Sequence, residues 1–403
     1  MKKITLVTLS LLLILSSANG QEYKKLHFKS IVVDTHNDIL TTAIDKNLII
    51  DQDLKGKTNS DLKRWAEGGV DVQIFSVWCD GLKQNPYAWA NREMDTLFAV
   101  ANRNPGKIAM VGNPTELLQA VKEKKLAVMF GVEGGHMIEN DLNKLDSFYK
   151  KGVRYMTLTW NNSSDWATSA LDESTAPPKS SPEGRASKDS ARRKGLTDFG
   201  KQVVRRMNEL GMMVDLSHVG EQTFWDAINT TTKPVIVSHS NAYALCPFRR
   251  NLKDDQILAV GKNGGVIHLN FFSGFIDSNF FKRSDAFNER HKAERDSMLK
   301  INPEPYFSDT YLFDKYPDEV KALRPPLSML IDHLDYIVKL IGVDHVGLGS
   351  DFDGVNSLPL ELDDVTAMPL ITRELLKRGY SKKNIRKILG GNFMRLFEVN
   401  MPK

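Results

Sequence analysis

The chain has 403 residues, enough for one large domain or two ordinary ones, and its 41% of hydrophobic residues can build a sizeable core. Lys and Arg number 54 and Asp and Glu number 50, and this near balance excludes the strongly basic surface of a nucleic-acid-binding protein. The cysteines are Cys79 and Cys246, so a disulfide-stabilised small fold is excluded, and we expect both to be buried core residues rather than a pair.

The N-terminus has the pattern of a secretory signal peptide. Lys2 and Lys3 precede an apolar run from Ile4 to Leu15, and the small residues at 18 and 20 suit a signal-peptidase site. The apolar run is short for an uncleaved anchor, which needs about 20 residues, and no later stretch is long and apolar enough to span a membrane. We therefore predict that residues 1–20 are removed, that the mature chain begins at Gln21, and that it is periplasmic or extracellular.

Short apolar runs rich in β-branched residues recur along the mature chain, with helical patterns between them. Eight such runs favour a closed (β/α)8 barrel of the TIM type, although an open doubly wound sheet has the same pattern. The predicted strands are Ile31–Val33, Val70–Val77, Leu126–Val132, Val153–Thr159, Met212–Leu216, Pro234–Val237, Gly265–Leu269 and His345–Leu348.

Helices are predicted between these strands. The segment at 198–210 has the best-defined ends, because Thr197 can cap its first turn and Gly211 can end it. The helical patterns include Ala88–Ala101, Pro114–Lys124, Asp198–Leu210 and Glu221–Asn229.

Two stretches interrupt the alternation. Residues 170–195 are rich in Ser, Pro, Lys and Asp and are predicted to form a long surface loop. Residues 277–325 are charged and aromatic, and their helical patches predict an insertion after the seventh strand. Insertions of this length either cover an active site or decorate the surface, and the sequence supports both interpretations. No linker divides the chain, so we predict a single domain over residues 21–403.

Polar side chains follow the first predicted strand abruptly, in the stretch IVVDTHNDIL at 31–40. His36 and Asp38 are two residues apart, so in an extended backbone they point to the same side. An imidazole and a carboxylate so placed can bind one metal ion. An isolated His-x-Asp is more often an ordinary turn, so the ends of the other strands decide the matter.

Four other predicted strands are followed by the same kinds of side chain. Glu133, His218, His239 and Asp351 each lie one to three residues beyond a strand. The C-terminal ends of the strands of a (β/α)8 barrel meet at one mouth, where active sites are built. The sequence therefore predicts that these side chains share one site with the pair at the first strand.

The combination of side chains indicates the kind of metal. Imidazoles and carboxylates without thiolates suit zinc or a similar divalent ion. Five ligands exceed the three protein ligands usual for one catalytic zinc ion. Two ions about 3.5–4 Å apart, sharing a bridging carboxylate, account for the surplus, and such a pair can activate water for hydrolysis.

Several segments are informative through their order and spacing along the chain: DTHND at 34–38, GVEGGH at 131–136, GVRYMTLT at 152–159, GLTDFGKQVVRRMNELGMMVDLSH at 195–218, PVIVSHSNAY at 234–243, RRN at 249–251, GSDFDG at 349–354 and GGNFMR at 390–395. In this order they resemble the membrane dipeptidase (renal dipeptidase) family of zinc metallopeptidases, within the amidohydrolase-like barrels. The resemblance covers nearly the whole mature chain and implies a secreted bacterial member.

The resemblance implies a role for each ligand-type residue. His36 and Asp38 would bind one zinc ion, and His218 and His239 would bind the other. Glu133 would bridge the two ions. Two zinc ions per chain are therefore expected.

The resemblance also implies roles in catalysis and substrate binding. Asp351 would carry the proton from the attacking water to the leaving amine, with Asp353 as the alternative. Arg250 would pair with the free carboxylate of a dipeptide, which suits a bidentate guanidinium, whereas the residues alone predict an ordinary surface arginine. His136 is expected to support a ligand rather than to bind metal, and His268 to lie in the core.

Two positions depart from the family pattern. Trp160 stands where renal-type relatives have a histidine that touches the substrate or the oxyanion, and Phe275 stands where they have a tyrosine that helps bind the terminal carboxylate. We expect Trp160 to narrow the pocket or to stack on a substrate side chain, and packing in the core is the alternative. The cysteine that would pair with Cys246 is absent, so Cys246 is expected to be free.

Together these features predict an exported binuclear zinc dipeptidase that hydrolyses short peptides by metal-activated water. Two alternatives stay open: a related amidohydrolase acting on N-acyl amino acids or other small amides, and a metal-binding protein without useful turnover. The expected partner is a small dipeptide and not nucleic acid, and a homodimer is the candidate assembly.

Overall fold

The computed structural model describes residues 21–174, 195–303 and 305–402. The predicted signal peptide and most of the predicted loop at 170–195 lie outside these ranges. Within them, no helix combines the length and the apolar character needed to cross a membrane.

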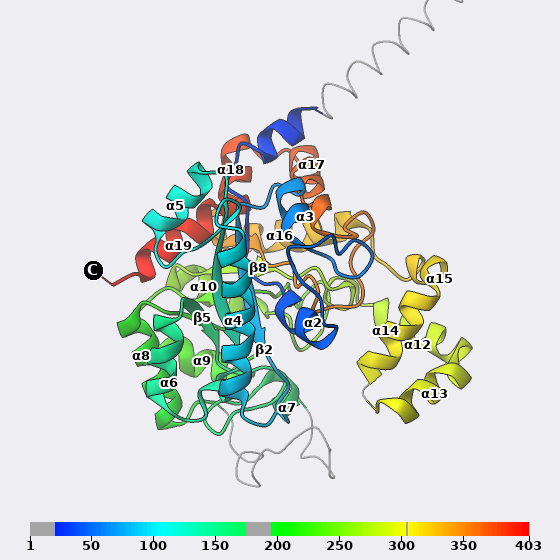
Figure 1. The fold of residues 1–403 in the computed structure, drawn as a ribbon, viewed down its shortest axis with the longest axis horizontal. Helices are drawn as coiled ribbons and strands as arrows, with labels where there is room; N and C mark the ends of the chain where they lie inside the picture. Colours follow the sequence, from blue (N-terminus) through cyan, green and yellow to red (C-terminus); the bar gives the residue numbers. More distant parts are fainter. Residues whose placement is uncertain (1–20, 175–194, 304, 403) are drawn as a thin grey trace, which may run out of the picture.

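A barrel of eight parallel strands forms the centre of the described chain, as predicted (Figure 1). Its strands, each hydrogen-bonded to the next, are β1 (Val33–Asp34), β2 (Val72–Trp78), β4 (Leu126–Glu133), β5 (Val153–Thr157), β6 (Met213–Asp215), β7 (Ile236–Val237), β8 (Val266–Leu269) and β9 (Val346–Leu348). The first and last strands meet beyond β1, where the Thr35 N–H donates to the Leu348 carbonyl at 3.1 Å and a parallel bridge joins Asn37 to Phe352. The open-sheet alternative is therefore wrong.

The strand β3 (Ile108–Met110) was not predicted. It pairs in parallel with β4 outside the ring of eight strands. It has three residues, and only Ile108 among them is buried. A strand this short does not produce a recognisable apolar pattern.

Alternate residues of β4 belong to two separate cores. Ala127 and Met129 pack with inward residues of the other strands, whereas Val128 and Phe130 pack against the surrounding helices. Side chains in a strand alternate with a period of two residues. Glu133 therefore continues the inward row of Ala127 and Met129 and points into the barrel at its C-terminal end.

Helices surround the barrel. The predicted helix at 198–210 has the predicted bounds: Thr197 Oγ1 accepts the Gly200 N–H at 3.1 Å, and Gly211 ends the helix at a φ of 81°. The helices around the barrel include α2 (Ile39–Asp45), α3 (Leu62–Glu67), α4 (Pro86–Arg103), α5 (Pro114–Lys122), α6 (Leu142–Lys150), α7 (Ala170–Ser174), α8 (Asp198–Leu210), α9 (Glu221–Thr230), α10 (Asp254–Asn263), α11 (Ser273–Ile276), α16 (Leu327–Ile341), α17 (Pro369–Lys377), α18 (Lys382–Arg386) and α19 (Asn392–Asn400).

Four further helices lie beside the barrel, drawn in yellow in Figure 1: α12 (Phe280–Arg290), α13 (Lys292–Ile301), α14 (Pro305–Lys315) and α15 (Pro317–Lys321). They follow β8, the seventh barrel strand, within the stretch predicted as an insertion. They share a small core of their own, made by Phe280, Phe287, Leu312, Phe313, Val320 and Leu323. The Tyr306 hydroxyl of α14 donates to the Gly354 carbonyl at 3.4 Å, so the cluster reaches the loop after β9.

Predictions about three core residues are confirmed. Cys79 and Cys246 are both buried and both free. His268 is 1% exposed within β8, where its Nδ1 lies 3.1 Å from the Val237 carbonyl.

Candidate metal centre

The predicted side chains meet at the C-terminal mouth of the barrel, and one group of them surrounds His36. Its Nε2 lies 3.4 Å from Asp38 Oδ2 and 4.0 Å from Asp351 Oδ1. All three side chains are buried. Asp351 has a φ of 62°, in the left-handed region that costs a non-glycine residue about 1–3 kcal/mol. The chain after β9 thus turns back to bring this carboxylate to His36.

A second group consists of His218 and His239, which follow β6 and β7. Their Nε2 atoms lie only 3.0 Å apart. His218 also has a left-handed backbone, with a φ of 63°, just past the end of its strand. The two imidazoles therefore present the same ring atom to one point in the mouth.

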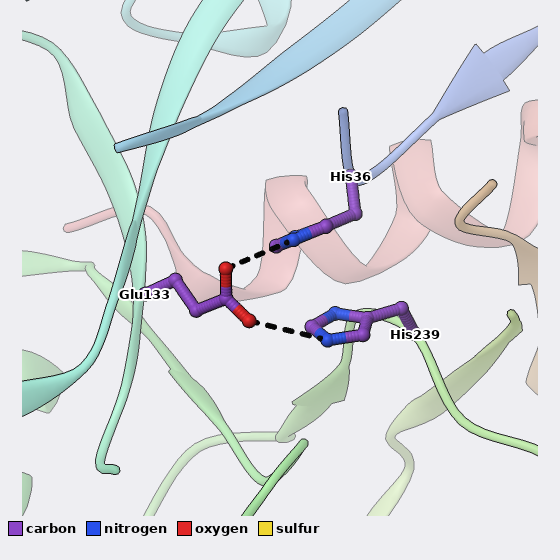
Figure 2. Close-up of side chains that lie close together, drawn as sticks. All are labelled: His36, Glu133 and His239. Atoms are coloured by element: carbon purple, nitrogen blue, oxygen red, sulfur yellow. Dashed lines mark ion pairs between the residues drawn. The ribbon is translucent and has the colours of Figure 1, made fainter. Parts of the chain in front are cut away.

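Glu133 lies between the two groups, and Figure 2 shows its carboxylate reaching toward His36 and His239. Its Oε2 is 3.3 Å from His36 Nε2. Its Oε1 is 2.8 Å from His218 Nε2 and 3.5 Å from His239 Nε2. Each oxygen of one carboxylate thus faces a different group, which is the arrangement of a bridging ligand.

Tyr155 of β5 fixes the ring of His36. Its hydroxyl donates to the Thr35 carbonyl at 2.9 Å, so it accepts a hydrogen bond from the Nδ1–H of His36 at 2.8 Å. The Nε2 atom of His36 therefore carries a lone pair that faces the mouth of the barrel. Within the described chain, Nε2 has no hydrogen-bond partner. The tyrosine ring passes over Gly131 on the neighbouring β4, where any Cβ would overlap it.

The other two imidazoles are oriented in the same way. His239 Nδ1 donates to Ser238 Oγ at 2.8 Å, because the Ser238 hydroxyl itself donates to Asp215 Oδ2 at 2.6 Å. His218 Nδ1 donates to Asn161 Oδ1 at 3.2 Å. Such partners on the remote ring nitrogen are typical of histidines that bind metal. Both Nε2 atoms then carry lone pairs that point at each other.

These residues fit a pair of divalent cations. Two lone pairs at 3.0 Å repel each other unless a cation lies between them. Burial, and then the charge of Arg250, lower the pKa of His218 to about 3, so this imidazole is neutral, as a metal ligand must be.

Asp351 and its alternative Asp353 occupy different surroundings. Asp351 Oδ2 accepts a hydrogen bond from Asn270 Nδ2 at 2.7 Å, whereas its Oδ1 faces His36. Asp353 turns away, since its two oxygens accept from the backbone N–H of residue 59 and from the Ser60 hydroxyl, each at 2.6 Å. Of the two carboxylates, Asp351 alone therefore points into the mouth.

Arg250 is a buried cation near the same mouth, with 5% of its surface exposed. Its guanidinium makes two long hydrogen bonds of 3.4 Å, to Ser240 Oγ and to the His239 carbonyl. No carboxylate of the described chain lies within ion-pair distance of it, and its Nε has no acceptor. Phe275, predicted to lie near the substrate carboxylate, has its ring centre 5.4 Å from the guanidinium carbon.

Trp160 lies at the rim of the centre and is partly exposed. Its ring centre is 6.4 Å from that of His218 and 4.9 Å from that of Trp78, which it meets edge to face. The side chain therefore borders the mouth and does not lie deep in the core. His136, the predicted supporting residue, is half-buried and has its Nε2 3.6 Å from Cys79 Sγ.

Comparison with known proteins assigns the chain to a family. The model for "Membrane dipeptidase (Peptidase family M19)" matches residues 20–401. The chain belongs to the membrane dipeptidase family. It is accordingly a hydrolase that acts on peptide bonds, and the side chains described above form its candidate centre.

Solved structures share the fold of this membrane dipeptidase family member. The probable dipeptidase PvdM from Pseudomonas aeruginosa is 24% identical, with a TM-score of 0.76 over 95% of this chain and 98% of the other. A metallopeptidase from Rhodobacter sphaeroides, liganded with a phosphinate mimic of L-Ala-D-Ala, is 22% identical, with a TM-score of 0.72 over 92% and 100%. The dipeptidase AC, a metallopeptidase of family M19, is 23% identical, with a TM-score of 0.73 over 92% and 98%.

The sequence did not predict that four residues of this peptidase orient the side chains of the centre: Tyr155, Asp215, Asn161 and Asn270. Two of them carried a signal. A glycine inside an apolar strand marks the close approach of another group, and Gly131 marks the path of Tyr155. A carboxylate inside a buried strand needs hydrogen-bond donors, and Asp215 meets Ser238 and Thr157.

Proposed function

We propose that this membrane dipeptidase family member is a binuclear zinc dipeptidase. His36 and Asp38 would hold one ion, His218 and His239 the other, and Glu133 would hold both. The observation that carries the proposal is the position of Glu133, whose two oxygens lie 3.3 Å and 2.8 Å from ring nitrogens of the two groups. A set of imidazoles and carboxylates without sulfur suits zinc.

When bound, the two ions would supply the positive charge that acidifies water and polarises a peptide carbonyl. Asp351 has one oxygen fixed by Asn270 and one that faces the centre. Its free oxygen would take the proton of the attacking water and pass it to the nitrogen of the leaving amine. Such a positioned acid–base group contributes about 10²–10⁴-fold to the rate.

Arg250 would bind the free carboxylate at the C-terminus of the substrate. It is a buried guanidinium without a carboxylate partner in the described chain, and a substrate carboxylate would supply that partner. Because the arginine lies beside His239, this contact would place the last peptide bond near the centre. The preference would be for short peptides with a free C-terminus.

The proposal is tested with purified protein, zinc and a library of dipeptides, together with elemental analysis after excess zinc is removed. We expect two zinc ions per chain and release of both amino acids. N-acyl amino acids in the same assay examine the alternative substrate class, and C-terminally amidated dipeptides should be poor substrates. One ion or fewer per chain would contradict the binuclear centre.

The substitution Glu133→Gln tests the bridge directly. A shared carboxylate serves both ions, so the variant should bind both more weakly, as measured by competition with a chelator. If one ion kept its original affinity, Glu133 would not bridge.

We also propose export with cleavage after Gly20. Mass spectrometry of the protein recovered outside the cytoplasm should find Gln21 as its first residue. Light scattering of the purified protein would show whether it is a homodimer.

A further inference from the structure

A cavity of about 700 Å³ opens beside His218 and Arg250. Its walls come from the start of α9 and from the loop between β7 and α10, and Tyr243 and Phe248 contribute aromatic surface. This volume lies within the range of about 300–1,000 Å³ that is usual for small-molecule sites. Since Arg250 is the proposed anchor for the substrate carboxylate, the cavity lies where the C-terminal residue of a dipeptide would extend.

The charged side chains around this cavity are mostly paired. Lys253 Nζ lies 2.7 Å from Glu221 Oε2. The Glu173 carboxylate accepts backbone N–H groups of the first turn of α9. Arg249 and Arg250 also line the cavity, and within the described residues neither has a carboxylate within ion-pair distance. The cavity is therefore lined by two consecutive arginines that form no ion pair within the described residues.

Each of the two guanidinium groups lies over an aromatic ring, and Arg249 is exposed whereas Arg250 is buried. The Arg249 carbon Cζ lies 4.8 Å from the centre of the Phe248 ring, and that of Arg250 lies 5.4 Å from the centre of Phe275. Phe248 stacks on Phe275 with ring centres 5.1 Å apart and on Phe281 at 5.0 Å. An arginine already positioned over a ring loses less conformational freedom when it binds an anion.

We propose that the cavity selects substrates whose C-terminal residue carries a second carboxylate, namely aspartate or glutamate. The inference rests on the proposed dipeptidase function. Arg250 would bind the α-carboxylate of that residue, and Arg249 would bind its side-chain carboxylate. Two cations that line one cavity without ion-pair partners are best matched by a ligand with two negative charges.

The test compares kcat/KM for Ala-Glu and Ala-Gln, which differ in charge but hardly in shape, with the C-terminal residue in the L and in the D configuration. We expect about fivefold preference for Ala-Glu in at least one configuration, the effect of a partly exposed ion pair. Arg249→Gln should abolish the preference by lowering kcat/KM for Ala-Glu toward the value for Ala-Gln, and Arg249→Lys should keep part of it. Raising the salt concentration should weaken the preference.

Arg92→Gln is the matched control. Arg92 is an exposed arginine on α4 whose Cζ lies 5.3 Å from the Trp89 ring centre, and it does not line the cavity. This variant has the same net charge as Arg249→Gln and should retain the preference. Two results would overturn the inference without touching the proposed dipeptidase function. One is an equal kcat/KM for Ala-Glu and Ala-Gln in the original protein, and the other is an unchanged preference for Ala-Glu in Arg249→Gln. Failure to cleave any dipeptide would overturn the proposed function, and the inference with it.

Discussion

Removing one oxygen from Tyr155 should weaken one metal site and leave the other intact. Tyr155→Phe keeps the buried ring but deletes the hydroxyl that accepts the Nδ1–H of His36 at 2.8 Å and donates to the Thr35 carbonyl at 2.9 Å. Loss of such a partner of a metal-binding histidine typically costs about 10–100-fold in metal affinity. A buried donor left without an acceptor also costs about 1–3 kcal/mol of folding free energy.

The assay is competition for zinc against a chromophoric chelator, together with urea unfolding of the metal-free protein. The affinity of the site at His36 should fall about 10–100-fold, whereas that of the site at His218 and His239 should change little. Tyr380→Phe is the control, because it also deletes a hydroxyl, one that donates to Asp335 at 2.7 Å far from the centre. This variant should lose stability but no metal affinity. Two zinc ions bound at the original affinities in Tyr155→Phe would refute the reasoning.

Three further changes give distinct outcomes. Asp351→Asn should keep both metal ions but lose about 10²–10⁴-fold in turnover, and near-normal turnover would assign proton transfer elsewhere. Trp160→Ala should alter the ranking of dipeptides with little loss of thermal stability, because the ring is partly exposed at the rim; a loss of about 3–5 kcal/mol with an unchanged ranking would instead indicate a core residue. Burial lowers the pKa of His27 from 6.5 to about 4, so the unfolded chain takes up this proton first as the pH falls. Above pH 6.5 the titration of His27 does not change the free energy of unfolding. Between pH 6.5 and pH 4 it lowers that free energy by about 3 kcal/mol. Urea unfolding should show that the free energy of unfolding changes less between pH 7.5 and pH 4.5 in His27→Gln than in the original protein. Equal changes in the two proteins would show that His27 is not the group responsible.

The barrel and the place of its centre follow from local features of the sequence. The eight runs of β-branched residues became the eight strands because strands buried on both faces are apolar throughout. The ligand-type residues were found because each follows such a run, and a closed barrel brings those ends together. The metals that these residues would hold stay a prediction.

The groups that orient the imidazoles depend on contacts between strands. Tyr155 lies inside the segment VRYMT, where an aromatic residue reads as ordinary core. Only the register of β4 against β5, with Gly131 opposite Tyr155, shows that the ring reaches past β4 toward His36. The family resemblance favoured Asp351 over Asp353, but the residues alone did not separate them, since both have left-handed backbones that no local pattern indicates.

The metal centre depends on Gly131, a residue that is not itself a proposed metal ligand or substrate contact, because the Tyr155 ring fills the space where a Cβ would lie. A method that transplants catalytic residues into another eight-stranded barrel would copy the five ligands and overlook this glycine. Alanine at that position in the recipient would overlap the tyrosine ring, and the histidine would lose its hydrogen-bond acceptor. The unit to be transplanted is therefore the ligand set together with the Gly131–Tyr155 pair across two neighbouring strands.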